Sequence, residues 1–215
     1  MRYKAIIFDL DGTLLNTIDD LADSANHVLC ELGLPVHDTE KYKYFVGNGI
    51  PKLIERCLPS DRQDLKQTAL ERFLKYYEQH SRDKTAPYDG IKQLLLSAAE
   101  KGIKLGVITN KADAIAKEVV EYYFGEGMFD YVRGLDETIK AKPCPDGALK
   151  TAGMLGVSPD EVFYVGDSGV DMCTAVNAGF TPCGVLWGFR QRDELIENGA
   201  RYIVSRPDEI LQYIE

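Results

Sequence analysis

Short apolar runs alternate with amphipathic stretches along most of the chain, and this alternation predicts a parallel sheet covered by helices. The opening run, residues 5–8, is short and rich in β-branched and aromatic residues, which favours a buried strand. After Tyr88 the pattern repeats, and it predicts strands at 103–108, 130–133, 162–165, 181–186 and, more weakly, 201–204. Helices are expected at 90–101, 112–124, 145–155 and 170–178, with two short helices around the last strand. Such alternation is typical of an α/β fold with both sheet faces covered.

The stretch from residue 16 to about residue 84 has no strand pattern and is expected to form helices at 17–32, 41–45, 50–57 and 62–80. Thr17, followed by acids, is typical of a helix start, and Gly33 and Pro35 favour the end of that helix. Because a strand precedes this stretch, we expect a small helical domain inserted into the core. The core would comprise 1–15 and 85–215, the insert 16–84, and such a two-point tether suits a lid.

Composition and charge narrow the functional classes. The chain of 215 residues is long enough to bury a substantial core, and its net charge of −9 disfavours nucleic acid as a partner. No apolar stretch approaches the roughly 20 residues of a membrane span, and the N-terminal apolar run is too short for a signal peptide. The five cysteines form no C-x-x-C pair. They predict reduced thiols in a cytoplasmic protein without a zinc site.

Two acids one residue apart, Asp9 and Asp11, follow the first predicted strand, and Gly12 comes next. Carboxylates this close repel each other. They persist where a divalent cation offsets the repulsion, or where one of them stays protonated. A nucleophile beside a general acid needs both conditions, although a turn or a helix cap also uses Asp and Gly.

Polar residues also follow two other predicted strands, and a lysine begins a predicted helix. Thr109 and Asn110 follow one strand, Asp167 follows another with Asp171 four residues later, and Lys142 precedes a proline. The carboxyl ends of parallel strands share one sheet edge, so we expect these side chains to gather there. A helix cap remains an alternative for Asn110, and a solvated acid for Asp171.

Taken in order, D-x-D-G-T, a strand ending in Thr, Lys-Pro and G-D-S-x-x-D resemble the four-motif signature of the haloacid dehalogenase-like hydrolase superfamily. The resemblance spans essentially the whole chain. Val46-Gly-Asn-Gly-Ile50 and Gly184-Val-Leu-Trp-Gly-Phe-Arg190 are similar to the phosphoglycolate phosphatase group, although related phosphatases share them. The resemblance implies a Rossmann-like parallel-sheet core with a helical cap after the first strand.

The resemblance also implies phosphoryl transfer through an aspartyl phosphate. Asp9 would be the nucleophile, and Asp11 would protonate the leaving oxygen and later take a proton from water. A Mg²⁺ ion would lie between Asp9, the backbone carbonyl of Asp11 and Asp167, with Asp171 either a ligand or an acceptor that holds its waters. The phosphoryl oxygens would be held by Thr109, Asn110 and Lys142.

The sequence therefore predicts a Mg²⁺-dependent phosphatase for a small phosphorylated metabolite, with phosphoglycolate as the best single candidate. Pyrophosphate cleavage and a mutase of the β-phosphoglucomutase type are alternatives on the same core. Dehalogenation is disfavoured because those relatives lack an acid at the position of Asp11. Outside enzymes, a phospho-acceptor domain or a silent binding protein is the competing class. We expect no nucleic-acid or membrane partner, and a monomer by default, with a dimer possible.

Overall fold

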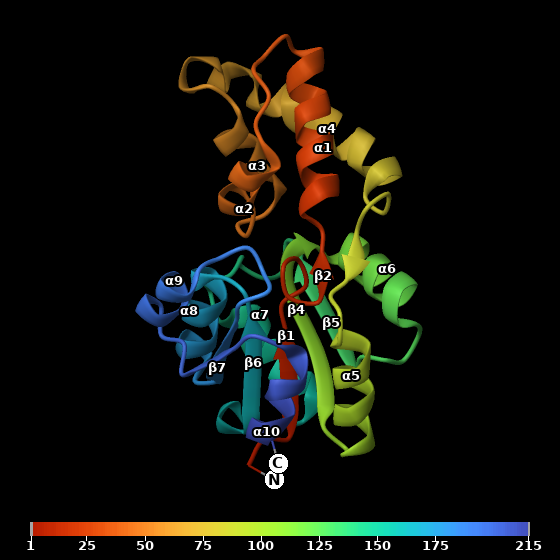
Figure 1. The fold of residues 1–215 in the computed structure, drawn as a ribbon, viewed down its shortest axis with the longest axis vertical. Helices are drawn as coiled ribbons and strands as arrows, with labels where there is room; N and C mark the ends of the chain where they lie inside the picture. Colours follow the sequence, from red (N-terminus) through yellow and green to blue (C-terminus); the bar gives the residue numbers. More distant parts are fainter. Residues whose placement is uncertain (1, 215) are drawn as a thin grey trace. The chain divides into compact units, whose positions relative to one another are not determined.

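The computed structural model describes residues 2–214 and divides into two compact units. The core unit comprises Met1–Leu15 and Pro87–Glu215, and the helical unit comprises Asn16–Ala86. The helical unit is thus an insertion between the first strand and the rest of the core, as the colours along the chain show in Figure 1.

The core unit is built on a six-stranded sheet in the order β5-β4-β1-β6-β7-β8, with every neighbouring pair parallel. This confirms the predicted α/β class. The chain moves from β1 to β4 and β5 on one side, and to β6, β7 and β8 on the other. The direction of winding reverses beside β1, and ligands of open parallel sheets bind at such a point. The strands are β1 Ala5–Phe8, β4 Lys104–Ala112, β5 Tyr131–Leu135, β6 Val162–Gly166, β7 Thr181–Val185 and β8 Tyr202–Val204.

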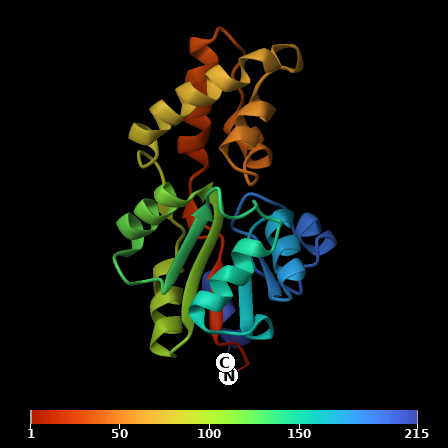
Figure 2. The same cartoon turned by 180° about the vertical axis from the view of Figure 1, so that it is seen from behind.

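Helices cover both faces of this sheet, as the two opposite views in Figures 1 and 2 show. Ile6 and Phe8 of β1 belong to an apolar cluster shared with α5 and α6, whereas Ala5 and Ile7 belong to a second cluster shared with α7 and α8. Alternate residues of a strand point to opposite faces, so β1 contributes to both clusters and is buried throughout. The core helices are α5 Ile91–Glu100, α6 Asp113–Phe124, α7 Asp146–Leu155, α8 Gly169–Ala178, α9 Arg192–Glu197 and α10 Leu211–Ile214.

The helical unit contains α1 Ile18–Glu31, α2 Thr39–Phe45, α3 Ile50–Cys57 and α4 Lys66–His80. A partly buried hydrogen-bond network complements its apolar packing. The hydroxyl of Tyr42 donates to Asn26 Oδ1 over 2.7 Å, and both groups of the Asn26 amide bond the backbone of His37. Near the end of the unit, the carboxylate of Asp20 accepts from the backbone N–H groups of Lys84 and Thr85.

Three local features differ from the sequence prediction. The predicted helix 62–80 begins as a separate 3₁₀ segment, Ser60–Leu65, because Arg62 is non-helical and the Gln63 amide donates to three nearby carbonyls. Strand β4 continues four residues beyond the predicted end, to Ala112. Two short strands that were not predicted, β2 Leu15–Asn16 and β3 Ala86–Pro87, pair with each other, since two-residue strands carry no readable alternation.

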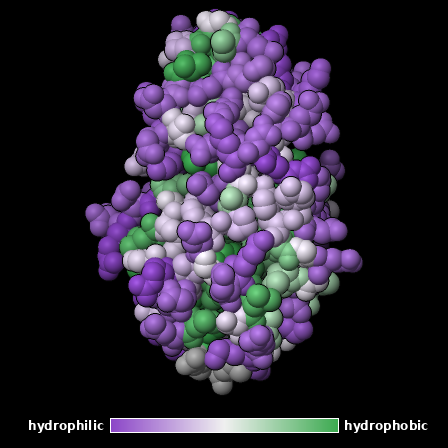
Figure 3. Space-filling model, turned by 45° about the vertical axis from the view of Figure 1, so that its right-hand side comes forward, coloured by the Kyte–Doolittle hydropathy of each residue, from purple (hydrophilic) through white to green (hydrophobic). Residues whose placement is uncertain are grey.

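Hydrophilic side chains cover most of the face drawn in Figure 3, in keeping with a composition that is 27% charged. Within residues 2–214 no helix combines the length and the apolar character that a membrane crossing requires. All five cysteines are free thiols, as predicted.

Candidate active site

The loop after β1 carries both motif acids and is held by backbone bonds at each end. The N–H of Asp9 donates to the carbonyl of Val165 on β6, over 2.9 Å. The N–H of Gly12 donates to the carbonyl of Leu15, which closes the turn. Gly12 has φ of +88°, and a Cβ atom there would lie 2.3 Å from Oδ2 of Asp167. Only glycine therefore allows the loop to approach Asp167 this closely.

Three buried carboxyl groups, those of Asp9, Asp167 and Asp171, gather beyond the ends of β1 and β6, with one oxygen of each within 4.8 Å of the others. Lys142 enters this cluster from the segment before α7. Its Nζ lies 2.8 Å from Asp9 Oδ1 and 2.7 Å from Asp171 Oδ1, and its side chain is 4% exposed. The structure therefore brings Asp9 together with three residues that lie at least 133 positions further along the chain.

One lysine faces three buried acids, and burial together with the repulsion among these acids shifts the pKa values of Asp9 and Asp167. Burial, and then the charge of Asp171, raise the pKa of Asp9 to about 7 although Lys142 acts in the opposite direction. Burial and the charges of Asp171 and Asp9 likewise raise the pKa of Asp167 well above its ordinary value. Burial lowers the pKa of Lys142, but its two carboxylate partners outweigh burial and raise that pKa well above the ordinary value.

Asp171 uses both of its oxygens on neighbouring groups. Oδ1 accepts from Lys142 and, at 3.2 Å, from the hydroxyl of Tyr164. Oδ2 accepts from the hydroxyl and the backbone N–H of Ser168, at 2.5 and 3.1 Å. Its contacts in this structure are those of a group that orients Lys142. Tyr164 and Ser168 were assigned no role from the sequence, because a tyrosine inside a buried strand reads as packing.

The two other predicted phosphate-binding residues lie on β4. Thr109 is buried, and its Oγ1 accepts from the backbone N–H of Lys111 at 3.2 Å. The side chain of Asn110 bonds the backbone of Lys142 twice: Oδ1 accepts from its N–H at 2.8 Å and Nδ2 donates to its carbonyl at 3.3 Å. In this structure Asn110 therefore fixes the segment that delivers Lys142.

Asp11 lies apart from the three-acid cluster and has a lysine of its own. Nζ of Lys111 lies 3.0 Å from Asp11 Oδ1 and 3.3 Å from Oδ2. Lys111 was not predicted, because the expected strand ended at residue 108. β4 continues to Ala112, with a register shift against β5 between Ile108 and Ala112. Thr109, Asn110 and Lys111 are all polar, so the sequence shows no alternation there that would have marked Lys111.

Backbone and side-chain bonds from residues 187–189 complete the support of the site. The N–H of Phe189 donates to Asp167 Oδ2 over 2.7 Å. The indole N–H of Trp187 donates to the carbonyl of Thr13, in the loop that carries Asp11. Neither residue was assigned a role in the site from the sequence, and the donors are an indole N–H and a backbone N–H, which side-chain type alone does not place.

The acidic cluster fits a magnesium ion. Its donors are carboxylate oxygens, which hard divalent cations prefer. Burial and the neighbouring carboxylates raise the pKa values of Asp9 and Asp167, and a divalent cation would offset the repulsion among these acids.

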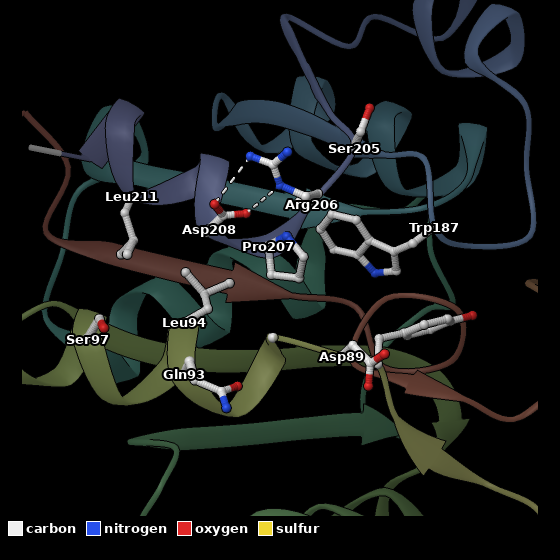
Figure 4. A pocket seen from close by; sticks show the side chains of 12 residues that line it. Asp89, Gln93, Leu94, Ser97, Trp187, Ser205, Arg206, Pro207, Asp208 and Leu211 are labelled. Carbon is white, nitrogen blue, oxygen red and sulfur yellow. Dashed lines mark hydrogen bonds and ion pairs between the residues drawn. The ribbon is translucent and has the colours of Figure 1, made fainter.

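A cavity of ≈ 650 Å³ lies elsewhere on the core unit, lined by α5 and the segment Pro207–Ile210 (Figure 4). Its walls are mostly apolar, with Trp187 at one end and an ion pair between Arg206 and Asp208 at the rim. None of the predicted site residues lines it. The candidate active site is therefore the polar cluster at the strand ends and not this cavity.

Comparison with known proteins agrees with the motifs. The family model for haloacid dehalogenase-like hydrolases matches residues 6–185. The chain is 30% identical over 212 residues to a phosphoglycolate phosphatase of Aquifex aeolicus (strain VF5), covering 99% of this chain and 97% of the relative. It is 33% identical to a phosphoglycolate phosphatase of Neisseria meningitidis serogroup A, covering 97% and 89%.

A solved structure agrees as well. A protein of Lactobacillus delbrueckii subsp. bulgaricus, provisionally named a phosphoglycolate phosphatase, superposes with a TM-score of 0.94 at 33% identity, covering 100% of this chain and 99% of that one. The resemblance seen in the four motifs is thus confirmed by matches that run along nearly the whole chain. With its parallel sheet, its acidic strand-end cluster and these relatives, the chain belongs to the haloacid dehalogenase-like hydrolase family.

Proposed function

We propose that this protein is a Mg²⁺-dependent phosphatase of the cytoplasm that hydrolyses phosphoglycolate through a phosphorylated Asp9. The observation that carries the proposal is the contact of the buried Asp9 carboxylate with Lys142 inside an acidic cluster. A carboxylate held in a fixed orientation beside a cation-binding cluster is suited to attack phosphorus, because positive charge around it offsets the charge of an incoming phosphate.

In the first step an oxygen of Asp9 forms a bond to phosphorus while the bond to the leaving oxygen breaks. The carboxyl of Asp11 gives its proton to that oxygen, and the alcohol departs. In the second step water attacks phosphorus, the carboxylate of Asp11 takes a proton from that water, and the bond to Asp9 breaks. Inorganic phosphate leaves, and both side chains return to their first state.

The surrounding residues assist through charge and position. Lys142 and Thr109 hold phosphoryl oxygens, and Asn110 and Asp171 keep Lys142 in place. Asp9, Asp167 and the backbone carbonyl of Asp11 would hold Mg²⁺. When bound, the ion supplies positive charge that favours ionised Asp9 and stabilises the transferring phosphoryl group.

The substrate assignment rests on the curated relatives that are named phosphoglycolate phosphatases and match nearly the full length. We further propose that the helical unit is the cap domain of the family and that its side chains set the choice of substrate. The pyrophosphatase and mutase alternatives use the same core chemistry, so the substrate must be determined by assay.

The test is a phosphate-release screen over phosphoglycolate, pyrophosphate and hexose phosphates, with Mg²⁺ and with EDTA. We expect phosphoglycolate to give the highest kcat/KM, and EDTA to abolish turnover until Mg²⁺ is restored. Faster release from pyrophosphate would overturn the substrate assignment while leaving the mechanism in place.

Acid-quench labelling with ³²P-labelled substrate tests the mechanism separately. The wild type should carry an acid-stable phosphoryl group, and Asp9→Asn should carry none and show no turnover. Turnover that survives Asp9→Asn would refute the nucleophile, and a single round of labelling without release would indicate a phospho-acceptor instead of an enzyme.

A further inference from the structure

We propose that Lys111 is a positioning residue for Asp11 and that it acts on proton transfer to the leaving group. This inference rests on the proposed function, because it presumes that Asp11 is the acid and base of the reaction. The two side chains come from residues 100 positions apart, and the Lys111 ammonium contacts both oxygens of the Asp11 carboxylate, at 3.0 and 3.3 Å.

The lysine of this pair is buried, and the acid is partly open to solvent. The Lys111 side chain is 3% exposed, whereas the Asp11 side chain is 20% exposed and can still reach a substrate. A buried ammonium group is costly unless a charged or polar partner compensates it. The pair therefore fixes Asp11 from the protein side and leaves the carboxyl open on the other side.

Two lysines contact three of the four acids of the site. Lys142 contacts Asp9 and Asp171, and Lys111 contacts Asp11. The two acids of the first motif thus have separate positive partners, delivered by different segments of the core unit. This separation allows the nucleophile and the acid to be held in different orientations although one residue lies between them.

The chemical consequence depends on the leaving group. When Asp11 gives up its proton it becomes a carboxylate, and the adjacent ammonium stabilises that product and holds its oxygens in place for the second step. A strongly basic alkoxide needs this proton in the transition state, whereas 4-nitrophenolate departs without it. Loss of Lys111 should therefore slow alkyl phosphates far more than 4-nitrophenyl phosphate.

The experiment compares kcat and KM of the wild type and Lys111→Gln with phosphoglycolate, ethyl phosphate and 4-nitrophenyl phosphate. General acid–base catalysis accelerates a reaction by about 10²–10⁴-fold. We expect Lys111→Gln to lower kcat by about 10- to 10²-fold on both alkyl phosphates. On 4-nitrophenyl phosphate the loss should stay below about threefold, with KM nearly constant throughout. Equal losses on all three substrates would overturn the proposal, and so would a loss confined to phosphoglycolate, which would indicate direct contact with the substrate carboxylate.

A double-mutant cycle supplies the second test. If Lys111 acts through Asp11, the variant that combines Lys111→Gln with Asp11→Asn should be no slower on ethyl phosphate than Asp11→Asn alone. Additive losses would refute the proposal. Lys104→Gln is the matched control, because it removes a lysine–aspartate pair at the opposite, exposed end of the same strand and should leave every rate unchanged.

Lys111→Arg is a control for the possibility that the glutamine variant misfolds. It keeps the charge, so it should recover part of the lost rate on alkyl phosphates, and thermal unfolding should confirm that both variants are folded. If the wild type gives no turnover, or if Asp9→Asn retains it, the proposed function fails. If those two behave as proposed but the selectivity for leaving group is absent, only the role of Lys111 fails.

Discussion

Asp9→Asn should stabilise the metal-free protein at neutral pH and, on the proposed mechanism, should also abolish turnover. Asp9 is 8% exposed and lies among other acids, and its pKa is raised to about 7 from an ordinary value of 3.8. Between these two pH values the folded protein holds a proton that the unfolded chain has released. Stability therefore falls as pH rises from about 4 to about 7, and it stays low above that range.

The magnitude follows from the same shift. Each pKa unit corresponds to about 1.4 kcal/mol, so a rise of about three units amounts to roughly 4 kcal/mol of lost stability at pH 8. Asparagine resembles the protonated carboxyl and carries no charge at any pH. We expect Asp9→Asn to raise the free energy of unfolding by about 2–4 kcal/mol at pH 8 in EDTA, and by much less at pH 5.

The same substitution at another buried aspartate should have the opposite sign. Asp20 is 2% exposed, but its carboxylate accepts from two backbone N–H groups and from the Thr85 hydroxyl at 2.7 Å. Asparagine keeps one acceptor oxygen and turns an amide donor toward those N–H groups. Asp20→Asn should therefore lower the free energy of unfolding by about 1.5–3 kcal/mol, because a hydrogen bond to a charged group contributes about that much.

Urea unfolding followed by two signals separates the two units. Trp187 is the single tryptophan and lies in the core unit, so its fluorescence reports the unfolding of that unit, while far-ultraviolet circular dichroism also records the helical unit. Asp9→Asn should move the fluorescence midpoint upward at pH 8, and saturating Mg²⁺ should stabilise the wild type more than the variant. A midpoint that moves downward at pH 8, or a difference that does not change with pH, would refute the electrostatic reasoning.

Two further predictions concern a close backbone approach in the core unit and a hydrogen bond in the helical unit. Gly12→Ala should reduce kcat by about 10²-fold or more and lower the free energy of unfolding by about 1–3 kcal/mol, because the added Cβ would collide with Asp167. Gly102→Ala is the control, since Gly102 also has positive φ but no atom lies within 4 Å of the added Cβ. In the same assays it should lower the free energy of unfolding by only about 1 kcal/mol and keep full activity. Tyr42→Phe removes the 2.7 Å hydrogen bond to Asn26 and should lower the free energy of unfolding of the helical unit by about 1–2 kcal/mol. Urea unfolding followed by circular dichroism measures this change. An unchanged unfolding midpoint would show that the hydrogen bond contributes nothing to stability.

The sequence predicted the parts of the fold that depend on periodicity. The buried run at 5–8 and the alternation after Tyr88 were sufficient to predict a parallel sheet, because strands buried on both faces are continuously apolar. Asp9, Lys142, Asp167 and Asp171 were likewise predicted to gather, since all four follow strands or begin a helix at one sheet edge, and the structure places them together.

Pairwise contacts within the site were beyond the reach of the sequence. Nothing in one chain indicates that Asn110 bonds the backbone of Lys142, or that Tyr164 inside a buried strand faces a lysine. Lys111 was missed because strand ends are the least readable part of a strand, and polar residues at 109–111 look like a loop. These contacts depend on three-dimensional register, which a one-dimensional pattern does not contain.

The pairing of β2 with β3 has an evolutionary consequence. Leu15–Asn16 and Ala86–Pro87 are hydrogen-bonded neighbours, and the N–H of Tyr88 donates to the carbonyl of Leu14 over 3.1 Å. The insertion therefore starts and finishes at a single junction, where splicing in a longer, shorter or unrelated segment leaves the register of the six parallel strands unaltered. Recombination at this junction could give the catalytic scaffold a new specificity in one event, without a compensating change elsewhere in the sheet.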